Sequence, residues 1–169
     1  MSLPLWNSRD VLDEGVHAAT MADVYDRMVL DAPHREHREM LFHALASYMA
    51  QVSRFVQSGR LWIDGGFSMR KPDEPHDVDV VVIPDDPAVI DSFTPEQRVD
   101  FMGLLTLQDV IIGSPGPCWM DRVQTVGGAL DGFVAAPDAL DPWLDTWSTV
   151  KRNGAVVPGE RKGFAEVRL

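Results

Sequence analysis

Two aspartates separated by one residue, Asp77 and Asp79, have the spacing in this sequence that most clearly suggests chemistry. They open an apolar, largely β-branched run over residues 77–83, which predicts a strand that ends at Pro84. Because side chains two apart on a strand point to the same face, we expect the two carboxylates to lie together. Two such charges repel each other unless a cation lies between them, and hard oxygen ligands suit Mg²⁺ or Mn²⁺.

A pair of glycines precedes these aspartates. Gly65-Gly66 follows the short apolar run of residues 61–63 and opens a polar loop over residues 67–76, which contains Arg70 and Lys71. Glycine lets backbone N–H groups approach an anion closely, and the two basic side chains add positive charge. Each feature alone is also typical of an ordinary turn or a solvated strand. In this order, they indicate a segment that binds a phosphorylated ligand beside a metal ion.

These motifs together resemble a known family. The run Gly65-Gly66-Phe67-Ser68-Met69-Arg70-Lys71, followed by His76-Asp77-Val78-Asp79, is similar to the signature of the polymerase-beta-type nucleotidyltransferase superfamily, especially of terminal transferase and its relatives. The resemblance implies that Asp77 and Asp79 bind the catalytic metal ions. It also implies that the nucleotide phosphates are held by Gly65, Gly66, Ser68 and Lys71. The commoner motif is Gly-Ser, so Gly66 departs from it, and Ser68 is the nearby hydroxyl.

The superfamily has a third metal-binding carboxylate. It lies on a later strand, next to the strand that carries the first two carboxylates. Asp131, inside the apolar segment 129–134, is the candidate for that role, and Asp109 is the alternative. An aspartate directly before Gly132 is also typical of a turn.

A second resemblance extends over almost the whole chain. Residues 15–20, the segment with the glycine pair and Asp-x-Asp, and residues 152–167 are similar to short, largely uncharacterised nucleotidyltransferase-like proteins of bacteria and their phages. This implies transfer of a nucleoside monophosphate from a nucleoside triphosphate, ATP among them, to a hydroxyl of an RNA end, a protein or a small molecule. It also implies a toxin-like role with an antitoxin partner. The alternative is a catalytically degenerate nucleotide-binding or protein-interaction module.

The composition fits these expectations. The chain has 169 residues, 45% of them hydrophobic, and a net charge of −11, which predicts one globular domain over residues 1–169. Residues 72–149 contain 15 acidic and 2 basic residues, so general nucleic-acid binding is disfavoured. Cys118 is the only cysteine and no stretch is apolar enough to span a membrane, so we expect a bacterial or phage-infected cytoplasm and no membrane partner.

The pattern of elements predicts an α/β or α+β class, with one small mixed sheet flanked by helices in a nucleotidyltransferase-like fold. Residues 1–19 are expected to be irregular, 108–125 to form a long loop and 153–159 to contain turns. The expected helices are residues 20–30, 33–59, 94–107 and 138–152, and the expected strands are residues 61–63, 77–83, 126–135 and 164–169.

Two further groups of residues have ordinary structural explanations as well as functional ones. His34, Arg35, His37 and Arg38 suggest a basic helix face, either solvated or for a nucleotide or RNA, and Trp143 and Trp147 suggest core.

Overall fold

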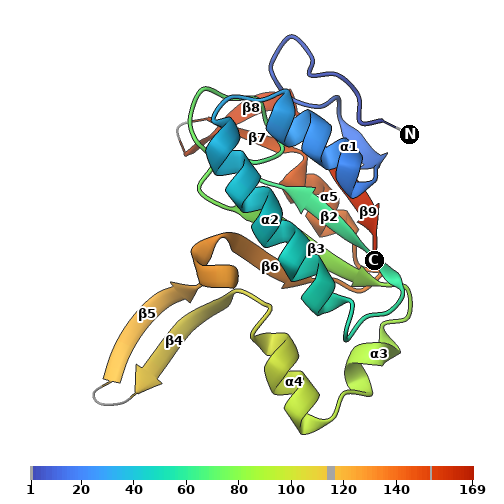
Figure 1. Ribbon diagram of the computed structural model, residues 1–169, viewed down its shortest axis with the longest axis vertical. Helices are drawn as coiled ribbons and strands as arrows, with labels where there is room; N and C mark the ends of the chain where they lie inside the picture. Colours follow the sequence, from blue (N-terminus) through green and yellow to red (C-terminus); the bar gives the residue numbers. More distant parts are fainter. Residues whose placement is uncertain (1, 114–116, 153) are drawn as a thin grey trace.

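A computed structural model describes residues 2–113, 117–152 and 154–169 of the chain as a mixed α+β protein. Its main sheet has, within these residues, five strands in the order β1-β9-β2-β3-β6 (Figure 1). The strands are β1 (Gly15–Ala18), β2 (Gly59–Asp64), β3 (Val78–Pro84), β6 (Leu130–Val134) and β9 (Gly163–Arg168). β1 runs parallel to β9 and β3 parallel to β6, whereas β2 is antiparallel to both neighbours, so the sheet is mixed, as expected.

Two helices, α1 and α4, begin where the sequence predicts helix caps. Thr20 and Thr94 each form a capping box, with Asp23 and Gln97 respectively. The helical segments are α1 (Met21–Tyr25), its π-helical continuation η1 (Asp26–Leu30), α2 (Arg35–Val52), α3 (Ala88–Asp91), α4 (Pro95–Met102), the 3₁₀ turn η2 (Val126–Gly128) and α5 (Asp141–Trp147). No helix in the part of the chain that the structure describes has the length and apolar character needed to cross a membrane.

The main sheet has a helix on each face (Figure 1). Val78, Val80 and Val82 of β3 belong to the apolar core on the α2 side. The alternate residues Val81 and Ile83 belong to a smaller core that includes Trp147 of α5. Because side chains alternate along a strand, Asp79 lies on the α5 side, together with Val81 and Ile83.

The prediction of a long loop over residues 108–125 is wrong. β4 (Leu107–Gly113) and β5 (Pro117–Val123) form an antiparallel hairpin that projects from the main sheet (Figure 1). The glycines and prolines that suggest a loop are gathered between residues 113 and 117, and residues 114–116 lie outside the described residues. The turn-forming residues therefore mark only the end of a hairpin, not the whole segment.

A second hairpin replaces the end of the expected helix 138–152. α5 ends at Trp147, and β7 (Thr149–Arg152) pairs with β8 (Ala155–Arg161), where turns were expected. The chain thus has two small sheets besides the main one in its described part, rather than a single sheet. Residues 15–18, expected to be irregular, form β1 because β9 offers them a parallel edge.

Two further helices are shorter than expected. α2 ends at Val52 rather than near Gly59, and α4 ends at Met102 rather than near Leu107. Beyond α2, Phe55 and Val56 still pack against the core from a turn. The apolar periodicity therefore continues past the end of the helix.

Candidate functional site

Three aspartates lie at paired positions of three adjacent strands. Asp79 of β3 pairs in register with Asp64 of the antiparallel β2 and with Asp131 of the parallel β6. Residues at paired positions of neighbouring strands present their side chains to the same face of the sheet. The three carboxylates therefore form a row across β2, β3 and β6, and Asp77 directly precedes β3 beside them.

Asp79, in the middle of the row, carries the most perturbed carboxylate of the site. Burial, together with the neighbouring carboxylates of Asp77 and Asp64, raises the pKa of Asp79 from 3.8 to about 6, against the opposing effect of Lys162 and Arg122. Among the described residues, no donor makes a hydrogen bond to the Asp79 side chain. The position thus concentrates negative charge that the surrounding protein compensates only in part.

The other two predicted metal ligands have protein partners. Asp131 is buried; it accepts a hydrogen bond of 2.9 Å from the Thr106 hydroxyl and forms an ion pair with Arg122, whose Nε lies 3.1 Å from Asp131 Oδ1. Asp77 accepts a hydrogen bond of 2.5 Å from the Gln124 side chain. Arg122 lies near the end of β5 and Gln124 directly follows this strand, so the end of the β4–β5 hairpin contacts two of the three predicted metal ligands, Asp131 and Asp77. The alternative third carboxylate, Asp109, is exposed on β4.

In the described part of the chain, no three or more His, Cys, Asp and Glu side chains are grouped so that they could hold a metal ion by themselves. The predicted aspartates thus lie at one end of the neighbouring strands β3 and β6, but they do not surround a metal position by themselves.

Asp64 is a site residue that the sequence analysis did not identify. It is buried and forms an ion pair with Lys162, the residue that directly precedes β9. Ser68 is fully buried as well, and its hydroxyl donates hydrogen bonds to Asp64 Oδ1 (2.7 Å) and to the Gly65 carbonyl (3.1 Å). The prediction that Ser68 holds a nucleotide phosphate is therefore corrected, because its hydroxyl faces Asp64 and not the open side of the site. The position of Asp64, directly before the glycine pair, is the one sequence signal for it.

Close contacts require glycine at position 65, whereas the contact at Gly66 is with the flexible end of a lysine. Gly65 has a φ of +78°, and a Cβ at this position would lie 1.9 Å from Asp79 Oδ2. A Cβ at Gly66 would lie 3.2 Å from Lys71 Nζ. Any larger residue at position 65 would displace the Asp79 carboxylate. The structure thus brings Gly65, Gly66 and Lys71 together with Asp79, as the sequence predicts.

Arg38 of α2 holds the backbone that follows the glycine pair. Its guanidinium is fully buried and donates hydrogen bonds to the carbonyls of Met28 (2.9 Å), Phe67 (2.7 Å) and Met69 (2.7 Å). Burial lowers the pKa of Arg38 to about 10. The predicted basic helix face is therefore wrong for Arg38. The signal was present in the periodicity, because position 38 lies on the buried stripe with Leu41 and Leu45.

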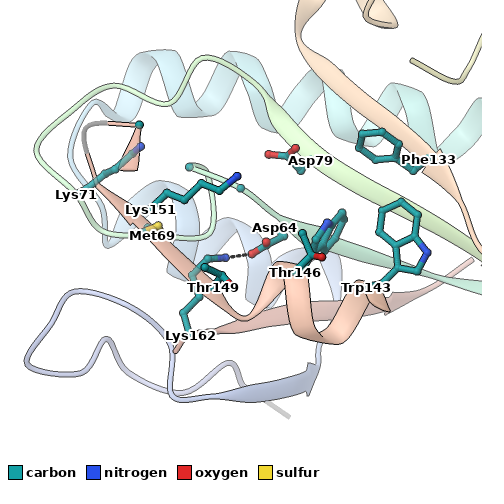
Figure 2. A pocket seen from close by; sticks show the side chains of 14 residues that line it. Asp64, Met69, Lys71, Asp79, Phe133, Trp143, Thr146, Thr149, Lys151 and Lys162 are labelled. Carbon is teal, nitrogen blue, oxygen red and sulfur yellow. Dashed lines mark hydrogen bonds and ion pairs between the residues drawn. The ribbon is translucent and has the colours of Figure 1, made fainter. Parts of the chain in front are cut away.

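A cavity of about 450 Å³ opens beside the carboxylate row. Charged residues and glycines form one part of its wall: Asp64, Gly65, Gly66, Lys71, Asp79, Lys151 and Lys162. Figure 2 shows Lys71 and Lys151 on one side, Phe133 and Trp143 on the other, and Asp79 and Asp64 between them. Lys151, Phe133 and Trp143 were not predicted as site residues. Trp143 was predicted to be core, but it is only partly buried and lines the cavity, whereas Trp147 is buried as expected.

Comparison with known proteins gives one match. No curated protein and no solved structure matches this chain. Residues 4–168 match the family DUF6932, which is described as a family of unknown function. This match covers nearly the whole sequence, and the chain therefore belongs to the DUF6932 family.

Proposed function

We propose that this protein is a metal-dependent nucleotidyltransferase, which moves a nucleoside monophosphate from a nucleoside triphosphate to an acceptor hydroxyl. The observation that carries the proposal is the register of Asp79 with Asp131 across the parallel strands β3 and β6. The resemblance of the Gly-Gly and Asp-x-Asp motifs implies a third carboxylate on the strand next to the first two, and Asp131 meets that requirement. The same pairing supports a nucleotidyltransferase-like arrangement of these strands.

The cavity supports a phosphorylated ligand. Lys71 and Lys151 line it and the backbone of Gly65-Gly66 borders it, whereas the third lysine of its wall, Lys162, is already paired with Asp64. Ammonium groups and exposed backbone N–H groups bind phosphate oxygens. A volume of about 450 Å³ is also within the range of sites that bind small molecules.

The carboxylates fit a divalent ion that arrives together with the triphosphate. Mg²⁺ is usually held by one or two carboxylates, with phosphate oxygens and water as its other ligands, so a closed protein cage is not needed. Asp79 lacks a hydrogen-bond donor among the described residues and lies between two other acids, which favours a cation there. Asp77 and Asp79 would hold one ion and Asp131 would bind a second, with phosphate oxygens and water as the remaining ligands. The bound metal would neutralise the triphosphate and the leaving pyrophosphate.

Apart from the metal, the transfer step needs a group that accepts the proton of the acceptor hydroxyl. The acceptor oxygen forms a bond to the α-phosphorus while the bond from that phosphorus to the bridging oxygen breaks, and pyrophosphate leaves. The proton of the acceptor hydroxyl goes to a carboxylate, for which we propose Asp131. The side chain of Arg122 is 45% exposed but Asp131 is buried, so Asp131 would accept this proton only once its ion pair with Arg122 has opened.

A second candidate function is a nucleotide-binding module without catalysis. The observation that favours it is that Lys162 and Arg122 already neutralise Asp64 and Asp131. Such a module would bind nucleotides at the same cavity but would transfer nothing.

Transfer of label from α-³²P-labelled nucleoside triphosphates in Mg²⁺ and bacterial extract tests the proposal. We expect the native chain to label an acceptor, and the variant with Asp77→Asn and Asp79→Asn to lose the activity by at least about 100-fold, because even indirect partners of metal ligands contribute about 10- to 100-fold. The matched control carries Asp100→Asn and Asp138→Asn, two exposed aspartates away from the cavity, and should label as the native chain does.

Two results would count against the proposal. Equal labelling by the native chain and the Asp77→Asn, Asp79→Asn variant would overturn the assignment of these residues. Nucleotide binding by the native chain without any labelled product would favour the non-catalytic module.

A further inference from the structure

The chemical nature of the residues that line the cavity differs from one side of it to the other. Lys71 and Lys151 lie on its cationic side, Asp79 and Asp64 lie in the middle, and aromatic rings form the opposite wall (Figure 2). A nucleoside triphosphate is divided in a similar way, because its anionic triphosphate and its flat aromatic base are attached to opposite ends of the sugar. The polarity of the cavity therefore matches the polarity of this ligand.

The aromatic wall is built from two elements. Phe133 follows Asp131 by two residues on β6, so it lies on the same face of the sheet, and Trp143 comes from the first half of α5. The two ring centroids are 5.4 Å apart, and the ring planes are inclined by 48°. Trp143 also packs edge-on against the buried Trp147, at 5.8 Å and 85°. These contacts fix the orientation of the Trp143 indole.

Trp143 packs on the outside of the core beneath this wall and is not one of its buried members. Trp62, Trp147 and Phe164 are buried and pack against one another on the α5 side of the sheet. Trp143 and Phe133 are only partly buried and line the cavity. Among the described residues, no acceptor takes a hydrogen bond from the Trp143 indole N–H. The large ring surface of Trp143 is thus fixed in position and open to a ligand.

We infer that Phe133 and Trp143 form a nucleobase-binding wall, with the base stacking on the indole of Trp143. The inference rests on the proposed function for the identity of the ligand. Stacking on an aromatic face tolerates all four bases, since every base has a π-face. The site therefore accepts nucleoside triphosphates of any base, and purines bind more tightly than pyrimidines because their ring area is larger.

Calorimetric titration with ATP, CTP and inorganic tripolyphosphate, each in Mg²⁺, tests this inference. We expect Trp143→Ala to weaken ATP binding about 5- to 100-fold and to leave tripolyphosphate binding unchanged, because only the nucleotides carry a base. Lys151→Ala should weaken all three ligands, since it removes a charge on the phosphate side. The control Trp119→Ala changes an exposed tryptophan of the β4–β5 hairpin and should bind every ligand as the native chain does.

A second readout does not depend on the folding of the alanine variant. ATP should quench the tryptophan fluorescence of the native chain, tripolyphosphate should not, and Trp143→Phe should remove most of the quenching while it keeps ATP binding within about threefold, because phenylalanine still stacks. Unchanged quenching in Trp143→Phe, or unchanged ATP affinity in a folded Trp143→Ala, would overturn the base-binding wall and leave the proposed function standing. Failure of the native chain to bind either ATP or tripolyphosphate would instead contradict the proposed function.

Discussion

Replacing Asp79 with asparagine is expected to stabilise the fold by about 3 kcal/mol at pH 8 and by almost nothing at pH 4. Burial and the neighbouring acids raise the pKa of Asp79 from 3.8 to about 6. The folded protein therefore binds more protons than the unfolded chain between these values, and its stability falls as the pH rises through about 6. Asparagine resembles the protonated carboxyl group, so the variant avoids this loss.

Urea denaturation of the native chain and of Asp79→Asn at the two pH values measures the effect. The control Asp100→Asn changes an exposed aspartate on α4 and should shift the free energy of unfolding equally at both pH values, within about 0.5 kcal/mol. An effect of Asp79→Asn that does not change with pH would contradict the electrostatic description of the site. The expected result means that the folded chain carries a destabilising charge, which a bound cation would relieve.

Replacing Arg38 with methionine is expected to lower the free energy of unfolding by about 3–5 kcal/mol. The methionine would fill most of the space but would leave the carbonyls of Met28, Phe67 and Met69 buried without their donor. Arg38→Lys should cost less than Arg38→Met but should not restore native stability, since one ammonium cannot reproduce the planar fork of the guanidinium.

The matched control for this prediction is Arg35→Met, an exposed arginine one turn earlier on α2, which should cost less than about 1 kcal/mol. Urea denaturation of the three variants at pH 7 provides the comparison. Equal stability of Arg38→Met and Arg35→Met would show that the buried guanidinium does not hold the segment after the glycine pair.

The main sheet was predictable wherever the sequence pattern is local. The β-branched run of β3, the alternating run of β9 and the capping boxes at Thr20 and Thr94 all lie where the residue types indicate. The two hairpins were missed because their turn residues outweigh the strand residues around them. Pairing between β7 and β8 also depends on a partner that a single segment of sequence does not reveal.

Some residues of the candidate site were likewise predictable from local sequence, whereas others were not. The proximity of Asp77 and Asp79 follows from strand periodicity, and the antiparallel pairing of β2 with β3 brings the glycine pair beside Asp79. Lys151 and Trp143 come from a later hairpin and helix, and only the order of strands in the sheet brings these elements to the cavity. Arg38 illustrates a different difficulty, because its helical position predicts burial while its residue type predicts exposure.

The central claim is that Asp79 and its neighbouring acids hold a divalent ion together with a nucleoside triphosphate. Electron paramagnetic resonance, which measures how much Mn²⁺ is bound, tests this claim most directly. Mn²⁺ is titrated with the native chain or with Asp79→Asn, in both cases in the presence of a non-hydrolysable nucleoside triphosphate. We expect the native chain to bind Mn²⁺ with the triphosphate at least about tenfold more tightly than Asp79→Asn does. Equal binding of Mn²⁺ by the native chain and the variant would contradict the claim.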